Sequence, residues 1–123
     1  MPDDLTYRGV ALWSLVINDV EWRPAAVAHI RTRSERRRTN ELDVEPEWAT
    51  EAALDPFRRA RESDSGSLEI VGLSTHAPQR HRADRGRVLK VWVLPTLEPG
   101  LWEGQSACEV EGWIENDYWT WRV

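Results

Sequence analysis

Apolar and polar residues follow two different periods along this 123-residue chain. Strand-like runs occupy residues 10–17 (VALWSLVI), 67–74 (SLEIVGLS) and 87–95 (RVLKVWVLP), and a weaker one covers 101–112 (LWEGQSACEVEG). Helix-like spacing occupies the stretch between the first two of these runs. The last segment, 113–123, fits either a short helix or a final strand.

The helical stretch divides into two segments that each begin at a proline. Alanines and aliphatic residues follow Pro24 and predict a helix from there to about Arg38. The second helix begins near Pro46, with glutamates close to its positive end. It ends at Asp55-Pro56, because the residue before a proline is disfavoured in the helical region.

The order strand, helix, helix and then three or four strands predicts an α+β domain. We expect a small antiparallel sheet with the two N-terminal helices packed on one face. Residues 76–87 (HAPQRHRADRGR) have no apolar period and are expected to form a long polar loop. The length suits one core, so a single domain over residues 1–123 is expected.

Charge is segregated along the chain, which has a formal net charge of −5. Six arginines lie within residues 23–38, and four arginines and a lysine lie within 80–90. Six of the acidic residues follow from position 98 onward. The net charge argues against a protein coated in basic surface for non-specific nucleic-acid binding, but it leaves room for a local basic site.

Several classes of protein are disfavoured by what the sequence lacks. The single cysteine, Cys108, cannot form an internal disulfide, and no signal peptide is recognisable, so a cytoplasmic protein is expected. The apolar runs are shorter than the roughly 20 residues of a membrane span. No glycine-rich phosphate loop, paired cysteines or helical histidine pair occurs, so neither a cofactor nor a metal site is expected.

Two basic segments are candidates for chemistry on RNA. The guanidinium groups of Arg33 and Arg36 could bind phosphate, although the same helix face could instead pair its arginines with nearby glutamates. In the second segment Arg80 and Arg82 are candidates for RNA binding. His81, Arg87 and Lys90 of that segment, with His29 of the first, are candidates for proton transfer and charge stabilisation. Simple solvent exposure is the competing explanation for the polar residues of the second segment.

Eight tryptophans form the third feature. Trp13, Trp48 and Trp92 lie in apolar patterns and are expected in the core. Trp113 and Trp119 lie with Glu111 in an acidic C-terminal segment, and such a surface could bind a basic partner protein. Core packing of these C-terminal tryptophans is the alternative.

A set of short motifs in fixed order resembles the BrnT-type toxins of bacterial type II toxin–antitoxin modules, which have a RelE/ParE-like fold. The resemblance covers about residues 20–118. Where the family has a basic residue after Ser-Ala, this chain has Cys108. The matching residues are Trp22, His29, Asp55, Pro56, Gly72, Ser74, Gly86, Arg87, Ser106, Ala107 and Tyr118.

This resemblance implies a small cytoplasmic endoribonuclease that cleaves messenger RNA without a metal. It also implies an antitoxin protein as partner. The alternative is a non-catalytic module on the same scaffold, either a degenerate toxin or a small regulatory or immunity-like protein that binds a partner. An interaction domain of a different fold is also compatible with the pattern.

Overall fold

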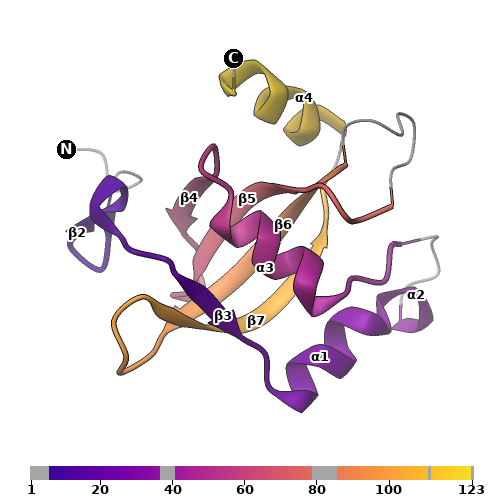
Figure 1. Cartoon of the computed structure of the whole chain (residues 1–123), viewed down its shortest axis with the longest axis horizontal. Helices are drawn as coiled ribbons and strands as arrows, with labels where there is room; N and C mark the ends of the chain where they lie inside the picture. The colour runs from indigo at the N-terminus through magenta and orange to yellow at the C-terminus, as the bar shows by residue number, and fades with distance from the viewer. Residues whose placement is uncertain (1–5, 37–40, 79–85, 111, 123) are drawn as a thin grey trace.

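The computed structural model describes residues 6–36, 41–78, 86–110 and 112–122. These residues form a mixed α+β structure with a two-stranded and a five-stranded sheet (Figure 1). The strands are β1 (Thr6–Tyr7), β2 (Val10–Ala11), β3 (Asp19–Glu21), β4 (Arg59–Glu62), β5 (Leu68–Ser74), β6 (Arg87–Pro95) and β7 (Leu101–Glu109); the helices are α1 (Pro24–Arg31), α2 (Arg33–Arg36), α3 (Pro46–Leu54) and α4 (Gly112–Trp121).

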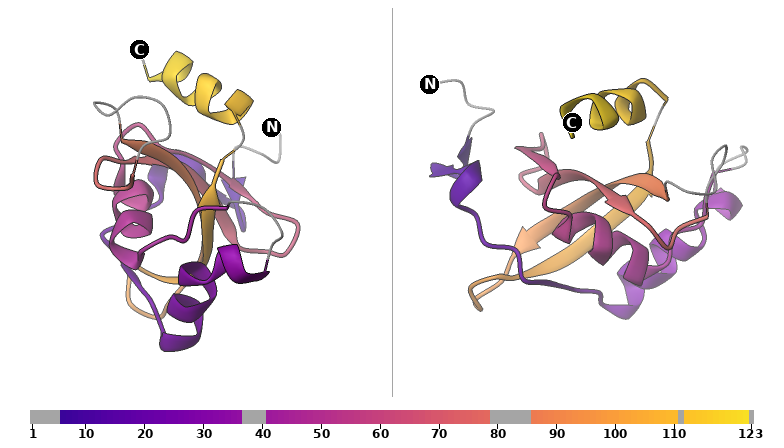
Figure 2. Two further views of the ribbon diagram at one scale, coloured as in Figure 1. Left: turned by 90° about the vertical axis from the view of Figure 1, so that its right-hand side faces the viewer. Right: turned by 45° about the horizontal axis from the view of Figure 1, so that its top comes forward.

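The large sheet has the strand order β3-β7-β6-β5-β4. Strands β4 to β7 form an antiparallel meander, and its last three strands confirm this part of the prediction. The sheet is mixed rather than antiparallel, because β3 pairs with β7 in parallel. Helix α3 lies across one face, α1 lies beside β7, and α4 lies at the end where β5 and β7 finish (Figures 1 and 2).

The main core lies between α3 and the sheet. Alanines on α3 (Ala49, Ala52 and Ala53) are fully buried, and their small size lets the helix approach the strands closely. The approach is closest at Gly72 of β5, where a Cβ atom would lie 1.9 Å from the backbone oxygen of Ala52. The other fully buried residues of this core are Ile30, Val44, Leu68, Ile70, Leu89, Val91, Val93 and Ala107.

Within the described parts of the chain, α4 covers one end of the opposite face of the sheet. There Tyr118 of α4 packs against Leu73 and Val88 in a second, smaller cluster. The carboxylate of Asp55 fixes this arrangement, since it accepts hydrogen bonds from the backbone of Leu73, at 2.8 Å, and from the hydroxyl of Tyr118. The final segment forms helix α4 and not a last strand, the other structure that the sequence allowed.

The predicted strand at residues 10–17 is wrong. Only Val10–Ala11 is strand, in a hairpin with β1, and Leu12–Ser14 form a 3₁₀ turn. The position beside β7 is taken instead by β3, where Val20 alone is buried. Trp13 is 90% exposed, so its expected place in the core is also wrong. Within this run only Ile17 is buried, and Val10 and Val16 are exposed as well; the backbone is held to the sheet by the hydrogen bond from Trp102 Nε1 to the Val16 carbonyl at 2.9 Å.

The predicted helix from Pro24 to Arg38 is interrupted. Helix α1 ends at Arg31, and Thr32 has φ −123° and bonds its hydroxyl to the Ala28 carbonyl. The short helix α2 follows. The pattern also missed β4, an edge strand of mostly charged residues whose membership in the sheet comes from pairing with β5. No helix among the described residues is both long and apolar enough to cross a bilayer.

Candidate functional site

The uncovered part of the sheet carries a set of polar side chains that we call the polar face. Side chains alternate along a strand, so on β6 Lys90 and Trp92 point away from α3. Their cross-strand neighbours Glu69, Cys108 and Ser106 point the same way. The polar face consists of Arg61, Glu69, Lys90, Trp92, Ser106 and Cys108.

Helix α1 and the start of α2 add two basic side chains at the border of the polar face. His29 Nε2 lies 3.2 Å from the hydroxyl oxygen of Ser106. Arg33 is 8% exposed and pairs with Glu41, with 3.4 Å between Nε and Oε2. A hollow of about 490 Å³ opens here; we call it the polar-face hollow. It is lined by His29, Arg33, Ser65, Ser67, Trp92, Leu94, Gln105 and Ser106.

Two cations of this face, Arg33 and Lys90, lie close enough to Cys108 to affect its thiol. Burial raises the pKa of its thiol, and the positive charges of Arg33 and Lys90 oppose that rise. Both cations therefore act on the same thiol. Of the predicted side chains, the structure places His29 and Arg33 in the lining of one hollow, and Lys90 near Arg33 on the polar face.

Most positive charge on the polar face is already paired. Lys90 Nζ lies 3.5 Å from a Glu69 oxygen, and the other oxygen of Glu69 accepts a hydrogen bond from Arg61. Arg33 is paired with Glu41, as expected if the arginines serve a helix face rather than a ligand. A phosphate that binds here must compete with these carboxylates.

Arg87 does not join the polar face. It is three residues from Lys90 on β6 and therefore points to the α3 side of the sheet. Its guanidinium donates to the Glu109 carboxylate and, at 3.2 Å, to the carbonyl of Pro78. Arg87 and Lys90 thus cannot hold the same phosphate.

The remaining predicted residues divide into two groups. Arg36 is the last residue of α2, and its side chain is not described; Arg80, His81, Arg82 and Glu111 lie outside the described residues. Trp113 is 64% exposed on α4, whereas Trp119 is half-buried, with its ring centre 5.2 Å from that of Tyr118. Because the two tryptophans lie six positions apart on a helix, they do not form one patch.

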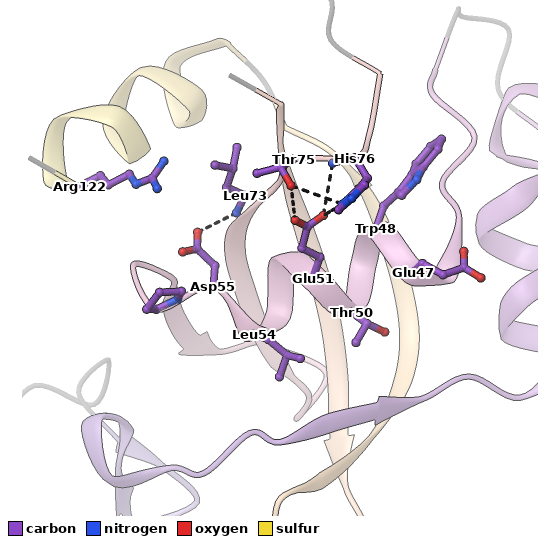
Figure 3. A pocket seen from close by; sticks show the side chains of 11 residues that line it. Glu47, Trp48, Thr50, Glu51, Leu54, Asp55, Leu73, Thr75, His76 and Arg122 are labelled. Carbon is purple, nitrogen blue, oxygen red and sulfur yellow. Dashed lines mark hydrogen bonds and ion pairs between the residues drawn. The ribbon is translucent and has the colours of Figure 1, made fainter. Parts of the chain in front are cut away.

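A second and larger cavity lies between α3, the end of β5 and Arg122, which follows α4 (Figure 3). We call it the α3 groove; its volume is about 800 Å³. The residues that line it are Glu47, Trp48, Thr50, Glu51, Leu54, Asp55, Pro56, Leu73, Thr75, His76 and Arg122.

Glu51 lies in the wall of this groove and binds the end of β5 to α3. One carboxylate oxygen accepts from the Ser74 hydroxyl at 2.7 Å and faces the His76 Nδ1 atom at 3.1 Å; Thr75 donates to the carboxylate as well. Burial alone would raise the pKa of Glu51, but the hydrogen bonds from Thr75, Ser74 and His76 outweigh it and lower the pKa to about 2.

Sequence reasoning assigned Glu51 only to the helix start and did not assign Trp92 or Ser106 to a site. Side chains alternate along the strand RVLKVWV, which places Lys90 and Trp92 on one face of the sheet and Arg87 on the other. The polar face could have been predicted from this alternation. The bonds of Glu51 join segments 23 residues apart, so no local pattern shows them. Among the described residues, no group of histidine, cysteine and carboxylate side chains is placed to hold a metal ion.

Models of protein families, curated proteins and solved structures were each compared with the chain, and none gives a significant match.

Proposed function

We propose that the chain is a BrnT-like protein of RelE-type fold whose polar face binds single-stranded RNA and cleaves it without a metal. The observation that carries this proposal is that His29 and Arg33 line one hollow, while Lys90 lies beside it on the polar face and acts with Arg33 on the thiol of Cys108. These side chains come from two distant parts of the sequence, and both were expected to contact RNA. A cytoplasmic location and an antitoxin partner belong to the same proposal.

The hollow and the adjacent Lys90 supply the groups that the proposed cleavage of a phosphodiester bond would use. In this mechanism His29, oriented by Ser106, removes the proton of the ribose 2′-hydroxyl. The 2′-oxygen attacks phosphorus, the bond to the 5′-oxygen breaks, and Lys90 and Arg33 stabilise the charge on the phosphoryl oxygens. The products are a 2′,3′-cyclic phosphate and a 5′-hydroxyl. Protonation of the leaving oxygen by His81 stays a prediction.

Trp92 completes the proposed site as a surface for a nucleobase. It lines the hollow next to Ser106 and is half-buried, and tryptophan rings stack on bases irrespective of their identity. A single-stranded substrate is therefore favoured over a duplex, in which bases are already stacked.

A second candidate function is binding without cleavage, on the same scaffold. It is favoured by the carboxylates that pair with Arg33 and Lys90 and by the absence of a basic residue at position 108. In this case the chain is a degenerate toxin that retains a partner-binding surface.

Purified protein and a 5′-labelled single-stranded RNA, incubated with EDTA, distinguish the two candidates. Cleavage that leaves cyclic phosphate ends and is lost in His29→Ala supports the ribonuclease. Arg23→Gln is the matched control, because Arg23 is exposed, pairs with Glu103 and lies outside the hollow. Intact RNA with every variant would favour the binding module. Induced expression in bacteria gives a parallel readout, since a ribonuclease toxin arrests growth and His29→Ala relieves the arrest.

A further inference from the structure

The α3 groove combines negative charge with an aromatic wall. Glu47 and Glu51 lie four residues apart on α3 and therefore on the same side of the helix, with Trp48 beside them (Figure 3). Leu54, Pro56 and Leu73 add an apolar part to the lining. Neither carboxylates alone nor apolar residues alone would define a ligand, but the two together fit a side chain that is both long and cationic.

The guanidinium of Arg122 and the imidazole of His76, which both line the groove, are already engaged. Arg122 places its guanidinium over the rings of Phe57 and Trp119, at 4.8 Å and 5.2 Å from the ring centres. His76 is held against Glu51 through Nδ1. The groove therefore keeps a negative balance, which Arg122 does not cancel.

Glu47 differs from most other glutamates near the helices. Glu41, Glu45 and Glu51 each have a partner within the chain. Glu47 is exposed in the first turn of α3, and no ion pair or hydrogen bond to its carboxylate occurs within the described parts of the chain. It is thus available to a cation from outside, next to a tryptophan ring that can add a cation–π contact.

We propose that the α3 groove binds a segment of a partner protein that presents an arginine or lysine next to apolar side chains. The cationic group lies between Glu47 and the ring of Trp48, and the apolar neighbours contact Leu54, Pro56 and Leu73. The charge complementarity and the apolar lining commit the site to a basic peptide rather than to RNA, which these carboxylates repel. The groove shares no lining residue with the polar-face hollow, so this binding does not depend on RNA cleavage.

The test uses a synthetic 16-residue helical peptide of alanine, leucine and arginine, titrated into the full chain. The tryptophan indole N–H signals are followed by NMR, and affinity is measured by calorimetry. We expect the Trp48 signal to shift and the Trp92 signal to stay in place. A peptide with citrulline, the neutral analogue of arginine, should not bind.

Matched variants separate a specific groove from attraction by net charge. Glu47→Gln should weaken binding roughly threefold, and Glu47→Gln combined with Trp48→Phe about tenfold. Glu98→Gln removes the same charge from the exposed β6–β7 turn and should leave the affinity unchanged. Equal effects of Glu47→Gln and Glu98→Gln, a shift confined to Trp92, or equal binding of the citrulline peptide would each overturn the proposal. Displacement of the arginine peptide from Trp48 by an RNA oligonucleotide would do the same.

Discussion

The hydroxyl of Tyr118 donates a hydrogen bond to the carboxylate of Asp55, and this contact joins the C-terminal helix to the end of α3. Asp55 also accepts from the backbone N–H groups of Phe57 and Leu73. One carboxylate therefore holds the turn after α3, the last part of β5 and α4 in a single arrangement. Both residues are fully or almost fully buried, so water cannot replace a bond that is lost.

Tyr118→Phe should destabilise the protein by about 2 kcal/mol, because it removes a hydrogen bond to a buried carboxylate and leaves the ring packing intact. Urea unfolding measures the change in free energy. Trp113→Ala is the control on the same helix, since Trp113 is 64% exposed, and it should change stability little. Equal stability of Tyr118→Phe and the wild type would show that the bond is not formed in solution.

Acid should weaken the fold through Glu51. Its pKa falls from 4.5 to about 2 on folding, so the unfolded chain binds more protons than the folded protein between those values. The stabilisation is complete above pH 4.5 and is lost as the pH falls toward 2. Between pH 6 and pH 3 the wild type should lose about 2 kcal/mol more unfolding free energy than Glu51→Gln. An NMR titration that places the Glu51 pKa near 4.5 would contradict this.

Gly72→Ala should destabilise the protein by about 3 kcal/mol or more, because the added methyl group would overlap the backbone oxygen of Ala52 and force α3 away from the sheet. Thermal and urea unfolding measure the effect. Gly112→Ala is the matched control: a Cβ there meets open space, and alanine favours a helix over glycine. We expect this second variant to be neutral or slightly stabilising. Similar losses in both variants would argue against the close contact.

Glu69→Gln tests whether the carboxylate that pairs with the cations of the polar face weakens their binding to RNA. The substitution frees Lys90 and Arg61 from their shared partner, so binding of a single-stranded RNA should strengthen about threefold, with a steeper dependence on salt. Fluorescence anisotropy with labelled RNA at two salt concentrations measures this. Glu103→Gln, which frees Arg23 outside the hollow, is the control for net charge. An equal gain in both variants would assign the effect to overall charge rather than to this face.

The sequence predicted the parts of the fold whose patterns are local. The strand at 87–95 and the helix that starts at Pro46 agree with β6 and α3, because an apolar strand run and a proline at a helix start are set by neighbouring residues. β4 was missed since Arg59–Glu62 lacks an apolar period and is a strand only through its pairing with β5. β3 was missed because the apolar run at residues 10–17 looked more like a strand than Asp19–Glu21 does.

The residue types of the polar-face site could be predicted from the sequence, but their arrangement in space could not. The basic character of His29, Arg33 and Lys90 is visible in the sequence, but their meeting depends on α1 lying beside β7. The partners that neutralise them are equally remote: Glu69 lies 21 residues from Lys90 along the chain. Local composition cannot show whether a cation is already paired. The α3 groove was not foreseen, since its two walls come from separate segments.

The charged strand β4 has a consequence for how copies of the protein meet. It is an edge of the sheet, and edge strands offer unpaired backbone groups to any other strand. The charged side chains of Arg59, Arg61 and Glu62 disfavour pairing with a second copy there, and the backbone N–H of Arg8 donates to the Glu62 carboxylate beside the strand. The protein is thereby protected against fibre-like growth through this strand, and oligomers would have to form through other surfaces.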